Sequence, residues 1–133
     1  MTGRDPSRAD TPFILIIEDN EDVREGIADL LQGEGMRTAR ASDGQQALEL
    51  ARTEGRPAAI VLDLKMPVMN GWEFLEAAQA TPELQSVPVV VITGTPDESL
   101  ARKLPVTMLR KPFRLNALVE AVRAAAGLKR GAG

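Results

Sequence analysis

Five short apolar runs, separated by segments with helical periodicity, constrain the fold of this chain more than any other feature. Three of the runs are continuous and rich in β-branched residues, as is typical of parallel strands buried on both faces. Strands that alternate with helices connect by right-handed crossovers, which put helices on both faces of one sheet. The sequence therefore predicts an α/β domain with five strands alternating with five helices, the strands at residues 13–17, 36–40, 58–62, 88–92 and 106–110.

Local signals in the intervening segments predict where the helices begin and which side chains they bury. Starts are predicted at a capping box of Ser42 with Gln45, at Asn70 with Glu73, and at Thr95 followed by Pro96. The stripes expected to face the core are Val23, Ile27, Leu30 and Leu31 in the first helix and Leu115, Leu118, Val119, Val122 and Ala126 in the last. By contrast, Arg114 stands where the last helix needs a Ser, Asp or Asn cap.

Polar residues follow four of the five predicted strands. They are Glu18 and Asp19, Asp63, Thr93 and Gly94, and Lys111 with Pro112. Taken singly, each has an ordinary interpretation, such as an acid near a helix N-terminus, a turn residue or a solvated charge. Open parallel sheets, however, bind ligands at the carboxyl ends of their strands. The fold would thus bring three carboxylates, a hydroxyl and an ammonium to one edge.

The chemistry of this set indicates a metal-assisted site for a phosphoryl group. Carboxylates crowded together raise one another's pKa and need a cation if all are to stay ionised. Oxygen ligands on strand ends suit Mg²⁺, which takes one or two carboxylates together with phosphate oxygens. A lysine and a threonine across such a site would contact an anionic ligand.

The composition of the chain excludes several kinds of site and of partner. The chain has no His and no Cys, which excludes a Ser-His-Asp triad, histidine or thiolate metal ligands and a disulfide framework. A net charge of −3 and 3% aromatic residues argue against a nucleic-acid binder. The charged N-terminal stretch does not resemble a secretory signal, and no apolar stretch is long enough to span a membrane. We therefore expect a cytoplasmic protein.

Four segments match a known family. The strings IIEDNEDVRE, VLDLKMPVMNGWEFL, VVVITG and KPF resemble the receiver domain of two-component response regulators, over roughly residues 13–127. The resemblance implies a flavodoxin-like (CheY-like) doubly wound sheet with strand order 2-1-3-4-5. Residues 1–12 are then expected to be a disordered lead and residues 128–133 a flexible tail.

The resemblance also implies a role for each site residue. Asp63 would be the phosphoacceptor, attacking a phosphoryl group carried on a partner's phosphohistidine. The Mg²⁺ ligands would be Asp63, Asp19, Glu18 acting largely through water, and the backbone carbonyl of Lys65. Lys111 would pair with a phosphoryl oxygen, the Thr93 hydroxyl would swing toward it, and the Gly94 amide would help to hold the anion.

Two departures from the family pattern concern the output of the domain. Met108 stands where receivers usually carry an aromatic switch residue, so either Met108 repacks into the space that Thr93 vacates or it is plain core. The interval from Thr93 to Lys111 is also shorter than usual by about one helical turn. The fourth helix is therefore expected to be short, over residues 96–103.

The leading interpretation is a single-domain response regulator rather than an enzyme. Its partners would be a sensor histidine kinase or histidine phosphotransfer protein and a downstream protein target, with homodimerisation on activation left open. A degenerate receiver that binds constitutively is one alternative. An aspartyl-nucleophile phosphatase is another, but such enzymes need an acid where this chain has Lys65. A dinucleotide-binding domain is poorly supported, because the loop after the first strand lacks the glycines of such a site.

Overall fold

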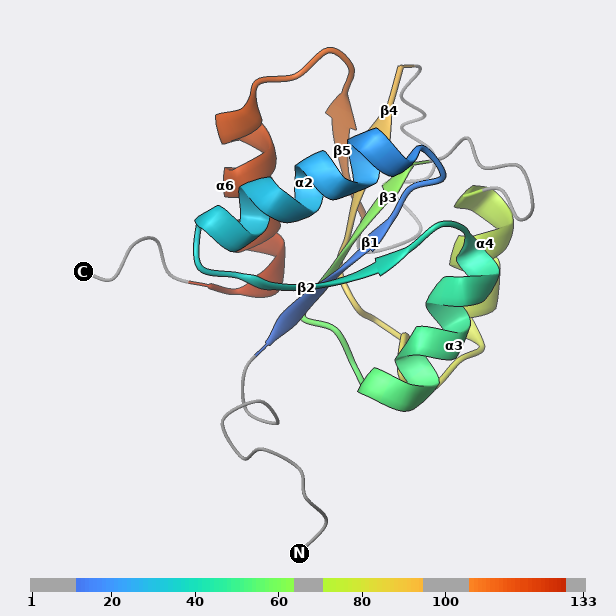
Figure 1. Cartoon of the computed structure of the whole chain (residues 1–133). Coiled ribbons are helices and arrows are strands. Elements are labelled where there is room, and N and C mark those ends of the chain that lie inside the picture. Colours follow the sequence, from blue (N-terminus) through green and yellow to red (C-terminus); the bar gives the residue numbers. More distant parts are fainter. Residues whose placement is uncertain (1–11, 64–70, 95–105, 129–133) are drawn as a thin grey trace, which may run out of the picture.

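A computed structural model of the chain describes residues 12–63, 71–94 and 106–128. The strands are β1 (Phe13–Ile17), β2 (Arg37–Ala41), β3 (Ala59–Asp63), β4 (Val89–Thr93) and β5 (Val106–Arg110). The helices in these residues are α2 (Glu21–Gly33), α3 (Gly44–Glu54), α4 (Gly71–Gln79) and α6 (Leu115–Ala126). All strand pairs are parallel, in the order β2-β1-β3-β4-β5 (Figure 1). The predicted sheet and strand order are confirmed.

Three strands lie one residue later than the sequence predicted. β2, β3 and β4 end at Ala41, Asp63 and Thr93, because the parallel ladder continues as long as a neighbouring strand supplies a partner. Asp63 pairs with Ile92, and Thr93 pairs with Arg110. Two of the candidate site residues are therefore the last residues of their strands rather than members of the following loops, which fixes their backbones in the sheet.

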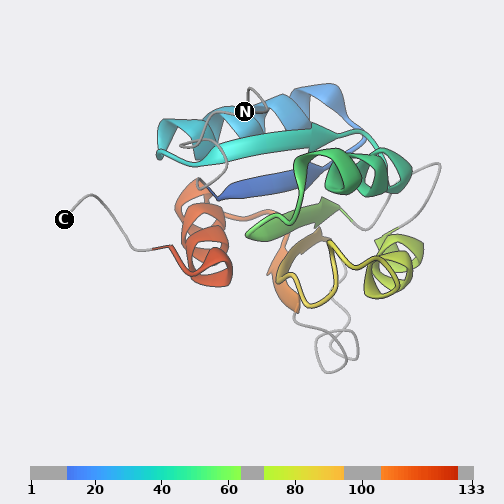
Figure 2. The same cartoon turned by 90° about the horizontal axis from the view of Figure 1, so that it is seen from below.

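The sheet lies between two helical layers, each with its own apolar core (Figures 1 and 2). Alternate residues of β1 enter opposite layers, with Leu15 and Ile17 on the side of α3 and α4 and Ile14 and Ile16 on the side of α2 and α6. All five residues of β1, of β3 and of β4 are buried. Burial on both faces explains why these strands read as continuous apolar runs.

The helix starts correct one detail of the sequence prediction. The capping box was predicted at Ser42 with Gln45, but the N-cap of α3 is Asp43, whose Oδ1 accepts a 2.9 Å hydrogen bond from the Gln46 amide. The Gln46 side chain in turn accepts from the Ser42 amide at 2.9 Å. Ser42 and Asp43 are both good caps, and the longer Asp43 side chain makes the observed contact.

Two residues predicted to face the core are exposed instead. Val23 is 45% exposed and Leu115 is 63% exposed, although the other members of their stripes are buried or half-buried. Both lie in the first turn of a helix that starts at the carboxyl edge of the sheet, where less of the sheet lies beneath the helix.

Several predictions fall on residues outside the described ranges. They are the lead before Pro12, the backbone carbonyl of Lys65, the start of α4 at Asn70, the short helix at residues 96–103 and the end of the tail. Within the described ranges, no helix has both the length and the apolar character needed to cross a membrane.

Arg114 offers a direct test of the helix caps. It is the N-cap of α6 in an extended conformation and makes no capping hydrogen bond with its side chain, as the sequence predicted. Arg114→Asp is expected to raise the free energy of unfolding by about 0.5–1 kcal/mol, because a carboxylate can accept from the first-turn amides. Urea unfolding in moderate salt measures this change. Arg114→Ala removes the charge without adding an acceptor, so equal stability of the two variants would contradict the expectation.

Candidate metal centre

Three carboxylates meet at the carboxyl edge of the sheet. β1 and β3 are neighbours with Ile17 opposite Leu62, so Glu18 and Asp63, each one residue further on, come side by side. Carboxylate oxygens of Glu18, Asp19 and Asp63 all lie within 4.8 Å of one another. Glu18 and Asp63 are buried, while Asp19 is exposed at the mouth of the cluster. The predicted cluster of acids is therefore present.

The loop that carries Glu18 and Asp19 is fixed by hydrogen bonds. The Glu18 amide donates to the Ala41 carbonyl at 3.1 Å, which extends the pairing of β1 with β2. The Asn20 amide donates to Glu18 Oε2 at 3.1 Å, and Asn20 Oδ1 accepts from the Val23 amide at 3.0 Å. The sequence prediction missed Asn20, although an Asn directly before a helical stripe is a recognised cap signal.

Glu18 is the electrostatically strained member of the cluster. Burial raises its pKa from 4.5 to about 7, and the nearby charge of Asp63 and hydrogen bonds with Asp19 and Asp63 act in the same direction, whereas the Asn20 amide opposes them. Three ionised carboxylates in this space are unfavourable without a positive charge. The cluster offers only hard oxygen donors, which fit Mg²⁺ in both chemistry and charge.

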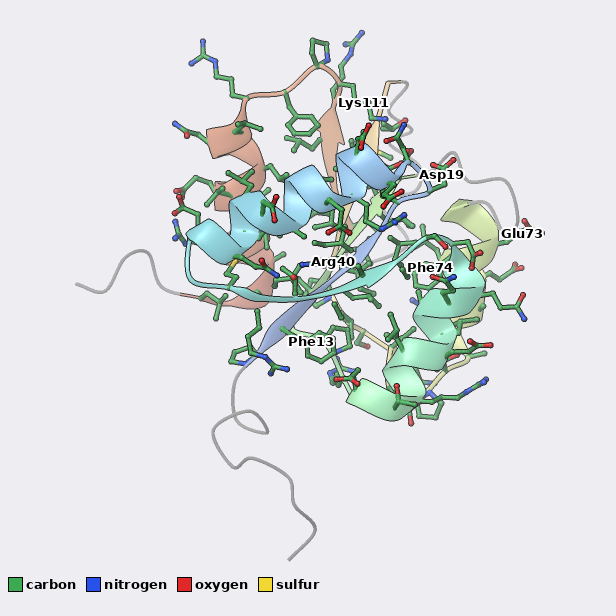
Figure 3. All side chains as sticks on the ribbon, in the orientation of Figure 1. Phe13, Asp19, Arg40, Glu73, Phe74 and Lys111 are labelled. Carbon is green, nitrogen blue, oxygen red and sulfur yellow. The ribbon has the colours of Figure 1, made fainter. Side chains whose placement is uncertain are left out.

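Lys111 reaches the same cluster from the end of β5, at the same carboxyl edge of the sheet. Its Nζ lies 3.6 Å from Asp63 Oδ2, although β4 lies between β3 and the strand that Lys111 follows. The Lys111 amide donates to the Thr93 carbonyl at 2.8 Å, and the Lys111–Pro112 peptide bond is cis. Asp19 and Lys111 lie at one edge of the molecule (Figure 3). The Lys111 side chain is 45% exposed, so its ammonium can meet an incoming anion.

β4 and β5 contribute the remaining candidate residues. Thr93 is buried at the end of β4, and Gly94 follows it in an exposed position where an added Cβ would meet no described atom within 4 Å. Met108 is half-buried, lies opposite Val91 and packs with the core on the side of α3 and α4. Thr93 and Met108 are therefore on adjacent strands, with Thr93 two residues beyond the partner of Met108.

A doubly wound parallel sheet with acids, a threonine and a lysine at its carboxyl edge defines a class of α/β domains that handle anionic ligands with a divalent cation. Residues 14–123 match the family described as the response regulator receiver domain. The chain belongs to this family, and receiver domains are signalling domains.

Curated relatives come from several kinds of signalling protein. The chain is 37% identical over 97 residues to the sensor histidine kinase TmoS of Ectopseudomonas mendocina, covering 73% of this chain and 10% of the relative. It is 36% identical over 81 residues to the polar-differentiation response regulator DivK of Brucella anthropi, covering 61% of this chain and 65% of DivK. The chain thus spans less than two thirds of either relative.

Solved structures confirm the fold. The chemotaxis protein CheY4 of Vibrio cholerae superposes with a TM-score of 0.77 at 27% identity, covering 86% of this chain and 98% of CheY4. The receiver domain of sensor histidine kinase PA1611 of Pseudomonas aeruginosa also gives a TM-score of 0.77 at 27% identity, covering 88% and 98%. The latter structure has a magnesium ion coordinated in its active site cleft.

Proposed function

We propose that this chain is a phosphorylation-controlled signalling domain that accepts a phosphoryl group from a partner's phosphohistidine onto Asp63. The observation that carries the proposal is the position of Asp63, which ends a central strand within 4.8 Å of two other carboxylates and 3.6 Å from the Lys111 ammonium. A carboxylate so placed is a nucleophile with a cation partner beside it.

The covalent step is an in-line transfer. One Asp63 carboxylate oxygen attacks phosphorus, the bond from phosphorus to the imidazole nitrogen breaks, and the imidazole, already protonated on its other ring nitrogen, leaves with the bonding electron pair. The product is an aspartyl phosphate and a neutral histidine on the partner. Lys111 pairs with a phosphoryl oxygen, and the Thr93 hydroxyl and Gly94 amide contact the same group.

Glu18, Asp19, Asp63 and the Lys65 backbone carbonyl would hold Mg²⁺. When bound, the ion neutralises charge on the transferred group and on the carboxylates. The acid cluster supports this assignment, because Glu18 carries a raised pKa that a bound cation would lower. We place the reaction in the cytoplasm, where ATP supplies the phosphoryl groups of histidine kinases.

The proposed partners follow from the relatives. TmoS and PA1611 are named as sensor histidine kinases, which supports a kinase or a histidine phosphotransfer protein as the donor. The output is binding to a downstream protein or onward transfer of the phosphoryl group. Met108 takes the place of the usual aromatic switch in this proposal, because it lies on the strand next to Thr93 and pairs with Val91, two residues before Thr93.

Incubation with a small phosphodonor such as acetyl phosphate tests the proposal. With Mg²⁺, the intact mass is expected to increase by one phosphoryl group, which hydroxylamine then removes as it does from acyl phosphates. With EDTA, uptake is expected to fall by about 100-fold, because charge neutralisation is lost. A chain that gains no phosphoryl group from acetyl phosphate or any histidine kinase would be a constitutive binding module, and steady release of phosphate from phosphoesters would indicate a phosphatase.

A further inference from the structure

The Arg24 side chain of α2 holds the loop that presents Asp19. Arg24 Nη1 donates to the Glu18 carbonyl at 3.0 Å, and the Arg24 side chain is only 17% exposed. The Arg24 amide also closes the first turn by donating to the Asn20 carbonyl at 2.9 Å. The peptide unit between Glu18 and Asp19 is therefore held by an arginine one turn into the helix.

The same arginine belongs to a chain of charges that leads to β2. Arg24 Nε lies 3.7 Å from Glu25 Oε2, and Arg40 Nη1 lies 3.1 Å from Glu25 Oε1. Arg40 precedes Ala41, whose carbonyl accepts from the Glu18 amide. Glu18 is thus held at its amide by β2 and at its carbonyl by α2, and Glu25 links the two sides.

From this geometry we infer that Arg24 is a positioning residue for the metal ligands. Asp19 is exposed, so packing does little to orient its side chain, and the preceding peptide unit fixes the position of the Cα from which its carboxylate extends. Arg24 holds that peptide unit through the Glu18 carbonyl. Groups that orient metal ligands from behind typically contribute 10–100-fold to metal affinity.

The inference rests on the proposed Mg²⁺ site, and titration of the purified metal-free chain with Mg²⁺ by calorimetry tests it. Arg24→Met keeps the length of the aliphatic stem and removes the donor, so the dissociation constant for Mg²⁺ is expected to rise about tenfold. Arg24→Lys retains one donor that can reach a carbonyl, and it is expected to recover part of the lost affinity.

Glu25→Gln is the matched control. It breaks the ion pairs to Arg24 and Arg40 but leaves the hydrogen bond from Arg24 to the Glu18 carbonyl, so Mg²⁺ affinity is expected to stay within about twofold of wild type, as for other partly exposed pairs. Urea unfolding of the metal-free variants shows whether a lost affinity reflects a lost fold. A role in general stability alone would lower the unfolding midpoint of Arg24→Met without changing the Mg²⁺ affinity of the folded fraction.

The titrations distinguish a failure of the proposed metal site from a failure of the proposed role of Arg24. If wild type binds no Mg²⁺, the proposed metal site itself is wrong. If wild type binds Mg²⁺ and a folded Arg24→Met binds it equally well, the metal site stands and the positioning role of Arg24 is overturned. Equal losses of affinity in Arg24→Met and Glu25→Gln would also overturn it, because the charge chain rather than the carbonyl contact would then set the affinity.

Discussion

Asp63→Asn is expected to abolish phosphoryl uptake, with a fall of at least about 1,000-fold against wild type, because the loss of a nucleophile removes most of a covalent mechanism. An asparagine amide keeps the size of the side chain and one carbonyl oxygen. It has no anionic oxygen to attack phosphorus, and it gives the Lys111 ammonium no charge partner. The intact mass after incubation with acetyl phosphate and Mg²⁺ measures the effect.

Asp29→Asn is the control for charge alone, since Asp29 is an exposed acid of α2 outside the acid cluster. This variant is expected to take up the phosphoryl group as wild type does. Uptake by Asp63→Asn at the wild-type rate would mean that the phosphoryl group is carried on another residue, and fragmentation of the labelled protein would identify that residue.

Glu18 is expected to make the metal-free protein less stable as pH rises from about 4.5 to about 7. In this window the folded chain keeps a proton on Glu18 that the unfolded chain has lost, so a rise in pH favours unfolding. A pKa raised from 4.5 to about 7 corresponds to a loss of up to roughly 3 kcal/mol of unfolding free energy, reached in full above pH 7. Glu18→Gln carries no titrating proton and is expected to be more stable than wild type by an amount that grows through the window.

Urea unfolding in EDTA at several pH values measures this difference, and Glu49→Gln, at an exposed position on α3, controls for the loss of one acid. Added Mg²⁺ at pH 7.5 is expected to stabilise wild type, by about 2.7 kcal/mol at a concentration 100 times the dissociation constant. The gain should be smaller in Glu18→Gln, which has one fewer anionic ligand. If the free energy of unfolding of wild type and of Glu18→Gln changed with pH in parallel, the raised pKa of Glu18 would not be the cause of the pH dependence.

The sequence predicted the sheet and the acid cluster well because both follow from simple periodic rules. Apolar runs buried on two faces mark the strands, and a parallel sheet brings the residues at their carboxyl ends together. What the sequence could not predict depends on tertiary contacts. The extra pair at Asp63 with Ile92 and the exposure of Leu115 are decided by a strand distant in sequence and by the edge of the sheet.

The role of Arg24 at the site could not be predicted from the sequence either. Its position in the first helix predicts only an exposed basic residue on an amphipathic surface. The contact with the Glu18 carbonyl arises because the chain turns back at Asn20, so that the second turn of the helix lies over the strand end. A periodic pattern indicates which face of a helix is apolar, but not which backbone group a long polar side chain will reach.

The two apolar layers are completed at different times while the chain is synthesised on the ribosome. The layer under α3 and α4 has its buried residues between Phe13 and Val91, so the chain made up to β4 already contains them. The opposite layer needs Leu118, Val119 and Val122 of α6 to cover one face of β3 and β4, whose Val61, Val90 and Ile92 are synthesised earlier. Since domains are made from the N-terminus onward, this face of β3 and β4 stays exposed and apolar until α6 emerges. A nascent chain that stalls before α6 therefore presents a surface suited to a chaperone on only one side of the sheet.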